Sequence, residues 1–353
     1  MAFKAPKRKR CKEDSDSDED SQQIAIPSET SQWTSHHLLE LHISHSNSKI
    51  SSPDELFDKF EEVSGCIPNL NDDYTKIYEY AQSKFKFDHT WEDLRRMSNI
   101  QLGRVLDPLR DLLIDLESEG NDDEGYKKLE KTLKKESRLM INKMRLMGAC
   151  FISELIDLIL ELNWVRNLSS LPETSFSSLL QSFCKICNFN GSTGVPKTKM
   201  EICHVTVASV PDLIYKQPSY KNPWRARSRI ITVAEVKKWS RQTRSESSSS
   251  TQIVTDTENV RGISQHVGQL LLACSDSLFT THALGIILNQ TKVMFTCLAL
   301  TEDFLDDVPE KLKDDDKGVV YTCGPYDLMT AADRKILLKA FLRLGLAQQE
   351  LNV

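Results

Sequence analysis

Two short segments of this 353-residue chain carry residue types that could hydrolyse a phosphodiester bond. Val210-Pro211-Asp212 ends in a carboxylate, and Ala234-Glu235-Val236-Lys237 adds a second carboxylate and an ammonium group. Both segments lie in stretches rich in Val, Ile and Thr, which predict β-strands. Alternate side chains of a strand share a face, so Glu235 and Lys237 should point the same way. The 22 residues between Asp212 and Glu235 are enough for a loop and a return strand, so the three charged groups can converge.

Convergence of these groups has a chemical use. Two neighbouring carboxylates repel each other and can hold a hard divalent cation such as Mg²⁺, which relieves the repulsion. A bound Mg²⁺ ion lowers the pKa of its water, and a nearby Lys can orient that water and stabilise the transition state. The residues therefore predict metal-dependent cleavage of nucleic acid. The alternative is structural: Asp212 closes a turn, while Glu235 and Lys237 form an exposed pair on a strand face.

The segment around these residues has the composition of a nucleic-acid-binding surface. Between Leu213 and Arg244 there are nine basic residues and a single acid, although the net charge of the whole chain is −6. Aromatic residues alternate with the basic ones and could stack on bases: Tyr215, Tyr220, Trp224 and Trp239. The predicted nucleic-acid-binding residues are Lys216, Lys221, Arg225, Arg227, Arg229, Lys238 and Arg241. DNA is favoured over RNA as the partner; the alternative is a charged hairpin loop whose aromatics pack on the core.

The elements that must position these residues fall into three regions. Residues 1–50 are dominated by Ser, Asp, Glu and Lys, which predicts a disordered tail. Residues 51–168 predict a helical domain, with helix starts at Ser52-Pro53, at Thr90-Trp91 and at Asp107-Pro108, hence about three helices before residue 119. A Leu and Met pattern then continues at helical spacing to Trp164. The helical region could bind a protein partner.

Residues 169–353 predict a small α/β domain. A helix is expected over 173–189, strands over 201–215 and 228–239, and a second helix over 260–273. Two apolar runs, 283–288 and 292–300, flank Asn289-Gln290-Thr291 and predict a hairpin. A short strand near residue 320 and a last helix through Leu346 complete the expected fold.

Pro211-Asp212, Glu235-Val236-Lys237, the following helix with Gln265, and the hairpin together resemble the PD-(D/E)XK nuclease superfamily, over about residues 173–300. The resemblance implies a restriction-endonuclease-like α/β domain with a mixed central sheet flanked by helices. It implies that Asp212 and Glu235 bind Mg²⁺ or Mn²⁺, that the Val236 carbonyl adds a ligand, and that Lys237 acts on the water. Gln265 best fits the glutamine that many members carry on the next helix, and Gln269 is second.

The chain departs from the family pattern at one position. Many members carry a Glu within the first core helix, but here Glu173 stands at the very start of the helix, with Gln181 inside it. Glu173 is therefore a further metal-ligand candidate. Because this acid is displaced, there is an alternative function. The chain could be a catalytically inactive nuclease-fold protein that binds nucleic acid or serves as a scaffold.

The remaining features concern location and other chemistries. Nine cysteines at irregular spacing, no signal peptide and no apolar run near about 18 residues predict a reducing intracellular setting without a membrane span. The basic cluster Lys4–Arg10 predicts import into the nucleus. Cys184, Cys187 and Cys203-His204 are a weak zinc candidate, because the first pair falls in a predicted helix.

Overall fold

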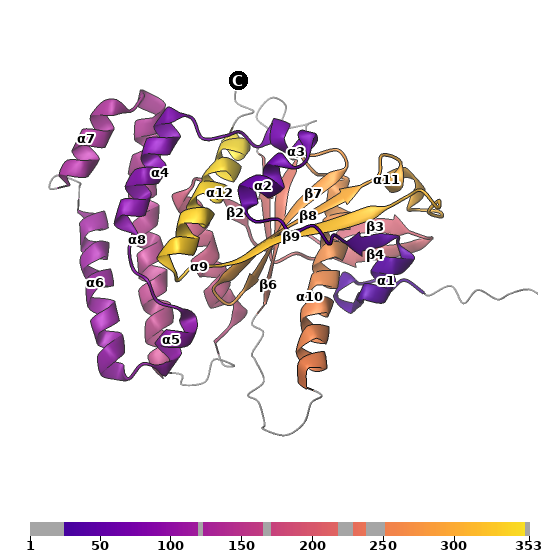
Figure 1. Cartoon of the computed structure of the whole chain (residues 1–353), viewed down its shortest axis with the longest axis horizontal. Coiled ribbons are helices and arrows are strands. Elements are labelled where there is room, and N and C mark those ends of the chain that lie inside the picture. The colour runs from indigo at the N-terminus through magenta and orange to yellow at the C-terminus, as the bar shows by residue number, and fades with distance from the viewer. Residues whose placement is uncertain (1–24, 119–122, 165–170, 218–228, 238–250, 350–353) are drawn as a thin grey trace, which may run out of the picture.

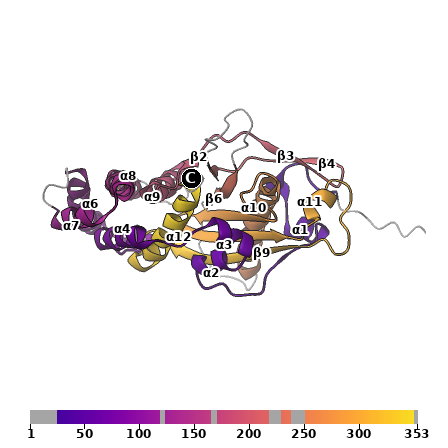
Figure 2. The same cartoon turned by 90° about the horizontal axis from the view of Figure 1, so that it is seen from above.

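The computed structural model describes residues 25–118, 123–164, 171–217, 229–237 and 251–349. Figures 1 and 2 show a group of helices on one side of the molecule and a sheet with its own helices on the other. The expected α/β class, with an N-terminal helical part and a mixed sheet flanked by helices, is confirmed. No helix of the described residues is both long and apolar enough to span a bilayer.

Seven strands form the central sheet, in the order β1-β9-β8-β7-β6-β5-β2. Their bounds are Ile43–His45 (β1), Gly191–Ser192 (β2), Leu213–Lys216 (β5), Ile230–Lys237 (β6), His282–Asn289 (β7), Lys292–Leu300 (β8) and Gly318–Asp327 (β9). β6 pairs in parallel with β7, and β1 in parallel with β9; the other neighbours are antiparallel. A separate hairpin joins β3 (Thr198–Ile202) to β4 (Val205–Ser209). The predicted hairpin around Asn289-Gln290-Thr291 is β7–β8.

Helices cover both faces of the sheet, so its central strands are buried on both sides. α10 (Thr251–Cys274) places Val267, Leu270 and Leu271 in one core with Val233 of β6. On the opposite face lie α9 (Glu173–Ile186) and α12 (Ala331–Gln349), in a core that includes Ala234 and Val236. A strand covered in this way needs apolar side chains on both faces, which explains the nearly continuous apolar sequence of β6 and β7.

The helical region comprises seven helices before residue 165 in the described part of the chain. They are α2 (Pro53–Asp58), α3 (Glu61–Cys66), α4 (Asp72–Lys84), α5 (Trp91–Arg96), α6 (Asn99–Glu117), α7 (Glu124–Thr132) and α8 (Lys135–Trp164); α11 (Phe304–Asp307) belongs to the sheet side. The prediction of about three helices up to residue 119 was wrong, because short helices fill the turns. Pro108 lies inside α6 and does not begin a helix.

α12 joins the helical region to the sheet. Its Arg343, 1% exposed, donates to Asp54 Oδ1 at 2.8 Å and to Asp58 Oδ1 at 2.7 Å, both on α2. Arg334 donates to the carbonyls of Phe85 and Phe87 in the segment between α4 and α5. One hydrophobic core runs from α2 through α8 into β5–β9. The helices before residue 168 and the sheet are therefore packed as one body.

Residues 25–50 correct the expectation of a disordered tail over residues 1–50. They form η1 (Thr30–Gln32), α1 (Ser35–Glu40) and β1, which adds an edge strand to β9. Trp33 is fully buried in the core beneath α10, where a Cβ on Gly268 would lie only 2.9 Å from its ring. The apolar residues of this segment are few, but they meet a surface that the distant α10 supplies.

The burial of Trp33 predicts that this segment contributes to stability. Trp33→Ala should lower the free energy of unfolding by about 3–5 kcal/mol, since it removes a large buried side chain and leaves a cavity. Leu39→Ala is the matched control: Leu39 is 62% exposed in the neighbouring α1, and its loss should cost no more than about 0.5 kcal/mol. Urea unfolding of both variants measures the difference. Equal stability of Trp33→Ala and the wild type would contradict the placement of Trp33.

Candidate active site

Asp212 is held against β6 by a backbone hydrogen bond. It immediately precedes β5, whose Leu213 pairs with Ala234 of β6. The Val236 N–H donates to Asp212 Oδ2 at 2.7 Å. The Asp212 side chain is solvent-exposed. The predicted convergence of the Asp212 segment with the Glu235–Lys237 strand is therefore observed.

Glu235 lies on the face of β6 that α10 covers and is only 3% exposed. Its Oε1 accepts hydrogen bonds from Lys237 Nζ and, at 2.6 Å, from Gln265 Nε2. Its Oε2 accepts from Gln269 Nε2. Both glutamines that the sequence suggested thus contact the same carboxylate. Lys237 also donates to Gln265 Oε1 at 3.3 Å, so the Gln265 amide bridges the ion pair.

The electrostatics of the cluster follow from this packing. Burial raises the pKa of Glu235 above its ordinary value; the adjacent Lys237 opposes the shift, and the Asp212 carboxylate adds to it. The alternative of an exposed Glu235–Lys237 pair is wrong, because α10 covers the carboxylate. Two carboxylates whose charges disfavour each other beside one ammonium group are a setting that an added cation would relieve.

A second layer of buried groups orients Gln269. Because Gln269 Nε2 donates to Glu235, its Oε1 is left to accept a hydrogen bond, and His266 Nδ1 lies 3.3 Å away. His266 must then carry its proton on Nδ1, which leaves Nε2 to accept from the Thr296 hydroxyl at 2.9 Å. This tautomer is the one that satisfies all three side chains.

Gly285 makes room for this layer. A Cβ at Gly285 would overlap His266 Nε2 and Thr296 Oγ1. The imidazole is completely buried, and burial lowers the pKa of His266 from 6.5 to about 4. A neutral His266 therefore fits the pattern of donors and acceptors around Gln269.

Of the described side chains near the end of β6, only a few could supply oxygen ligands to a metal ion. Asp212 and Glu235 are the carboxylates among them. No group of three or more His, Cys, Asp or Glu side chains able to hold a metal occurs within the described residues. Glu173 is exposed in the first turn of α9. In the described chain, the side chain of Glu235 accepts hydrogen bonds from Lys237, Gln265 and Gln269. Glu173 is not brought to Glu235 by any of these bonds.

The predicted nucleic-acid-binding residues are described only in part. Lys221, Arg225, Arg227, Lys238 and Arg241 lie outside the described residues, as does the basic cluster Lys4–Arg10. Arg229 precedes β6, at the end opposite to Lys237, so it is about 20 Å along the strand from Glu235. Tyr215 is buried and stacked on Phe189 with ring centroids 4.1 Å apart, so it cannot stack on bases as predicted.

The cysteines behave as core residues. Cys184 and Cys187 are buried at the end of α9, and burial raises the pKa of the Cys184 thiol to about 12. Deprotonation to a metal-binding thiolate is thus disfavoured, which agrees with the weak standing of the zinc candidate.

Comparison of the chain with protein-family models, with curated proteins and with solved structures found no match. The arrangement of its own residues therefore carries the functional argument. Sequence reasoning missed His266 and Thr296. One signal was available for His266: Gln265, His266 and Gln269 stand at helical spacing next to the apolar residues 270–273, which indicates polar groups that share a buried partner.

The depressed pKa of His266 predicts a pH dependence of stability. Between pH 6.5 and about 4 the unfolded chain binds a proton that the folded chain excludes, so the free energy of unfolding falls as pH falls through this window. A pKa of 6.5 unfolded against about 4 folded corresponds to about 3 kcal/mol. The loss should be complete below about pH 4.

His266→Gln isolates this contribution, because the variant keeps a polar side chain but no group that titrates there. Urea unfolding at a series of pH values should show the stability advantage of the wild type shrinking from pH 7 to pH 4. Parallel curves for the two proteins would show that His266 is not a buried neutral imidazole.

Proposed function

We propose that this protein is a metal-dependent nuclease that hydrolyses phosphodiester bonds of DNA, with Asp212, Glu235, Lys237 and Gln265 as its catalytic residues. One observation carries the proposal: Asp212 is bonded to the β6 backbone beside Glu235, which is itself paired with Lys237 and Gln265. Two carboxylates, one ammonium group and one amide thus meet at the end of a central strand.

The donor set suits a hard cation. Mg²⁺ is commonly held by one or two carboxylates, with waters and substrate phosphates completing its shell. Asp212 and Glu235 would hold Mg²⁺ or Mn²⁺, with the Val236 carbonyl as a further oxygen ligand. Such an ion would supply Lewis-acid activation of water and neutralisation of phosphate charge.

The chain's own residues would then divide the remaining work. Lys237, one-fifth exposed at its side chain, can direct an N–H toward a water or a phosphate oxygen while staying beside Glu235. Gln265 donates a hydrogen bond to Glu235 and accepts one from Lys237, so it fixes the positions of these two side chains relative to each other. Gln269 fixes the other oxygen of Glu235. The buried half of the cluster is thereby positioned before substrate arrives.

The order of elements supports membership of the PD-(D/E)XK superfamily as part of this proposal. α9 precedes strands β5 and β6, α10 follows, and β7 returns parallel to β6. The basic cluster Lys4–Arg10 supports a nuclear location, and the helical region before residue 168 supports a contact with substrate or with a protein partner.

Cleavage assays on the purified full chain test the proposal. The wild type should nick or cut plasmid DNA with Mg²⁺ or Mn²⁺ and not with EDTA. Asp212→Asn and Glu235→Gln should each lower the rate about 100-fold or more, because they remove a charge while keeping the shape and most hydrogen bonds. Lys237→Met should have a similar effect.

Glu201→Gln serves as the matched control, since Glu201 is an exposed carboxylate on β3 outside the cluster. It should cleave as the wild type does. A wild type that is inert on single-stranded, double-stranded and branched DNA, although folded and supplied with either metal, would refute the enzymatic proposal.

A second candidate function has a specific observation in its favour. Both oxygens of Glu235 already accept hydrogen bonds, from Lys237, Gln265 and Gln269. A cation would have to compete with these donors, and within the described residues Glu173 forms no hydrogen bond with any member of the cluster. A catalytically inactive nuclease-fold protein that binds nucleic acid or serves as a scaffold would retain this arrangement as a structural cluster.

Calorimetry separates the two candidates. An active nuclease should bind Mn²⁺ in a reaction that Asp212→Asn and Glu235→Gln each weaken by roughly tenfold or more. An inactive scaffold should show no Mn²⁺ binding that depends on these two residues. Glu201→Gln again provides the control for nonspecific binding to surface carboxylates.

A further inference from the structure

The proposed cleavage site needs cationic groups near it to hold DNA, and the predicted residue Arg229 lies at the wrong end of β6. Cationic groups that serve this site should lie at the edge of the sheet where Lys237 stands. In the register of the sheet, Lys237 pairs with Asn289 of β7, and Asn289 pairs with Lys292 of β8. Two strand spacings, about 10 Å, separate Lys237 from Lys292.

Helix α5 is attached at this same edge. Glu92 of α5 forms an ion pair with Lys292, whose Nζ lies 3.0 Å from Glu92 Oε1. The neighbouring Trp91 packs edge-on against Phe176 in the first turns of α9, with ring centroids 5.8 Å apart. These contacts hold α5 against the end of β8 and against α9, two strands away from Lys237 on the same edge of the sheet. In Figure 1, α5 and the end of β6 that carries Lys237 both lie toward the lower part of the molecule.

α5 ends in two exposed arginines, Arg95 and Arg96, and neither has a salt bridge with a carboxylate in the described part of the chain. Asp93, the nearest acid in sequence on this helix, accepts a hydrogen bond from Thr90 Oγ1 at 2.6 Å and interacts with Arg96 only through its charge. By contrast, Arg334 and Arg343 are buried and donate hydrogen bonds that join the helices to the sheet side. Within the described residues, Arg95 and Arg96 therefore form no ion pair that joins one element to another.

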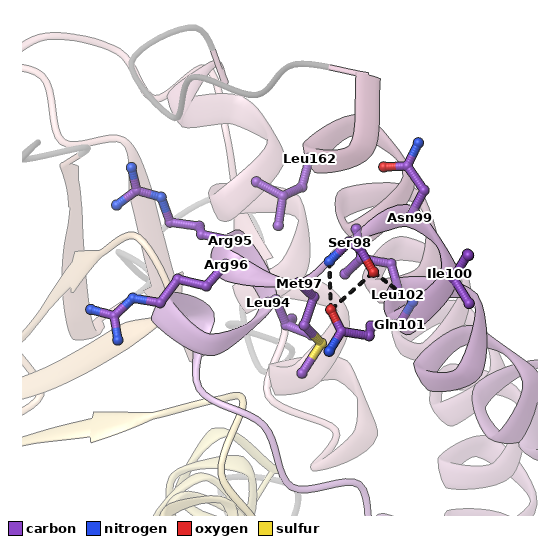
Figure 3. Close-up of a pocket in the computed structure, with 10 residues that line it drawn as sticks. All are labelled: Leu94, Arg95, Arg96, Met97, Ser98, Asn99, Ile100, Gln101, Leu102 and Leu162. Carbon is purple, nitrogen blue, oxygen red and sulfur yellow. Dashed lines mark hydrogen bonds between the residues drawn. The ribbon is translucent and has the colours of Figure 1, made fainter.

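The two arginines border an open hollow of about 680 Å³ at the turn from α5 into α6. Figure 3 shows both guanidinium groups extending to the same side, away from α6. Ser98 and Asn99 add polar groups to the lining, while Leu94 and Leu162 add apolar surface. Planar guanidinium groups with free donors bind phosphate oxygens well, and the mixed lining suits sugars between phosphates.

We propose that Arg95 and Arg96, with the hollow beside them, bind the sugar–phosphate backbone of DNA a few nucleotides from the bond that lies at Asp212 and Glu235. This inference rests on the proposed function, which places the scissile bond at that edge of the sheet. The helical region thereby acquires a specific role as half of the substrate-binding surface. Charge complementarity selects the partner, because two unpaired cations on a concave surface match consecutive phosphates.

Binding of a fluorescent DNA duplex to the full chain, measured by anisotropy in EDTA at several salt concentrations, tests the inference without cleavage. Arg95→Ala/Arg96→Ala should weaken binding roughly tenfold, whatever the DNA sequence. The slope of log affinity against log salt should fall by about 2, since each phosphate contact contributes about 0.9. The matched control is Arg104→Ala/Arg110→Ala, which removes two exposed charges of α6 that do not line the hollow.

The outcomes separate this inference from the proposed function. Loss of binding in the Arg95/Arg96 variant, but not in the control, supports the surface even if the wild type never cleaves DNA. If the wild type cleaves DNA, and the Arg95/Arg96 variant binds and cleaves as well as it does, the surface is refuted while the nuclease stands. Equal losses in both double variants would show a general charge effect and also refute it.

Two further arms test the choice of DNA. A matched RNA duplex should bind more weakly than DNA and lose less affinity in the Arg95/Arg96 variant. Binding to RNA alone, or no binding of the wild type to any nucleic acid, would overturn the inference. In the latter case the hollow would instead be a surface for an acidic protein.

Discussion

The burial of one carboxylate, Glu235, is the constraint around which the sheet side of this protein is arranged. A charge removed from water destabilises the fold by several kcal/mol unless nearby groups compensate it. Lys237 from the same strand and two glutamines from α10 supply that compensation. Gln269 is in turn oriented by His266 and Thr296, and this layer requires a glycine at 285. The compensation of the Glu235 charge on β6 thus depends on side chains of α10, and their orientation depends on residues of β7 and β8.

In the proposed nuclease, the same arrangement would prepare the site for chemistry. Glu235 is buried, whereas Asp212 is exposed just before β5 and is held next to Glu235 by the N–H of Val236. A substrate or cation would approach from the side of Asp212 and meet a carboxylate already oriented by its neighbours. The competition between a cation and the hydrogen bonds of Glu235 is what distinguishes an active nuclease from an inactive scaffold with the same fold.

The helical region is joined to this site through α12 and α5. Arg334 and Arg343 are buried where α12 meets the helices, and their removal would deprive the Phe85 carbonyl and Asp58 of these hydrogen bonds. Because this joint is continuous with the core, α5 keeps a defined position at the edge of the sheet. The unpaired arginines at its end are therefore presented in a fixed relation to Asp212 and Glu235, which a flexibly linked helical domain could not achieve.

The sequence by itself determined the local features. Strand alternation placed Glu235 and Lys237 on one face, turn residues predicted the β7–β8 hairpin, and apolar spacing predicted the helix that ends at Trp164. Tertiary structure alone decided that α10 buries Glu235, that Trp33 packs beneath α10, and that α5 is attached to the sheet through Glu92 and Lys292. The reason is physical: backbone periodicity is set by neighbouring residues, whereas burial and ion pairing depend on which distant surfaces meet, and a sequence window contains only one of the two surfaces.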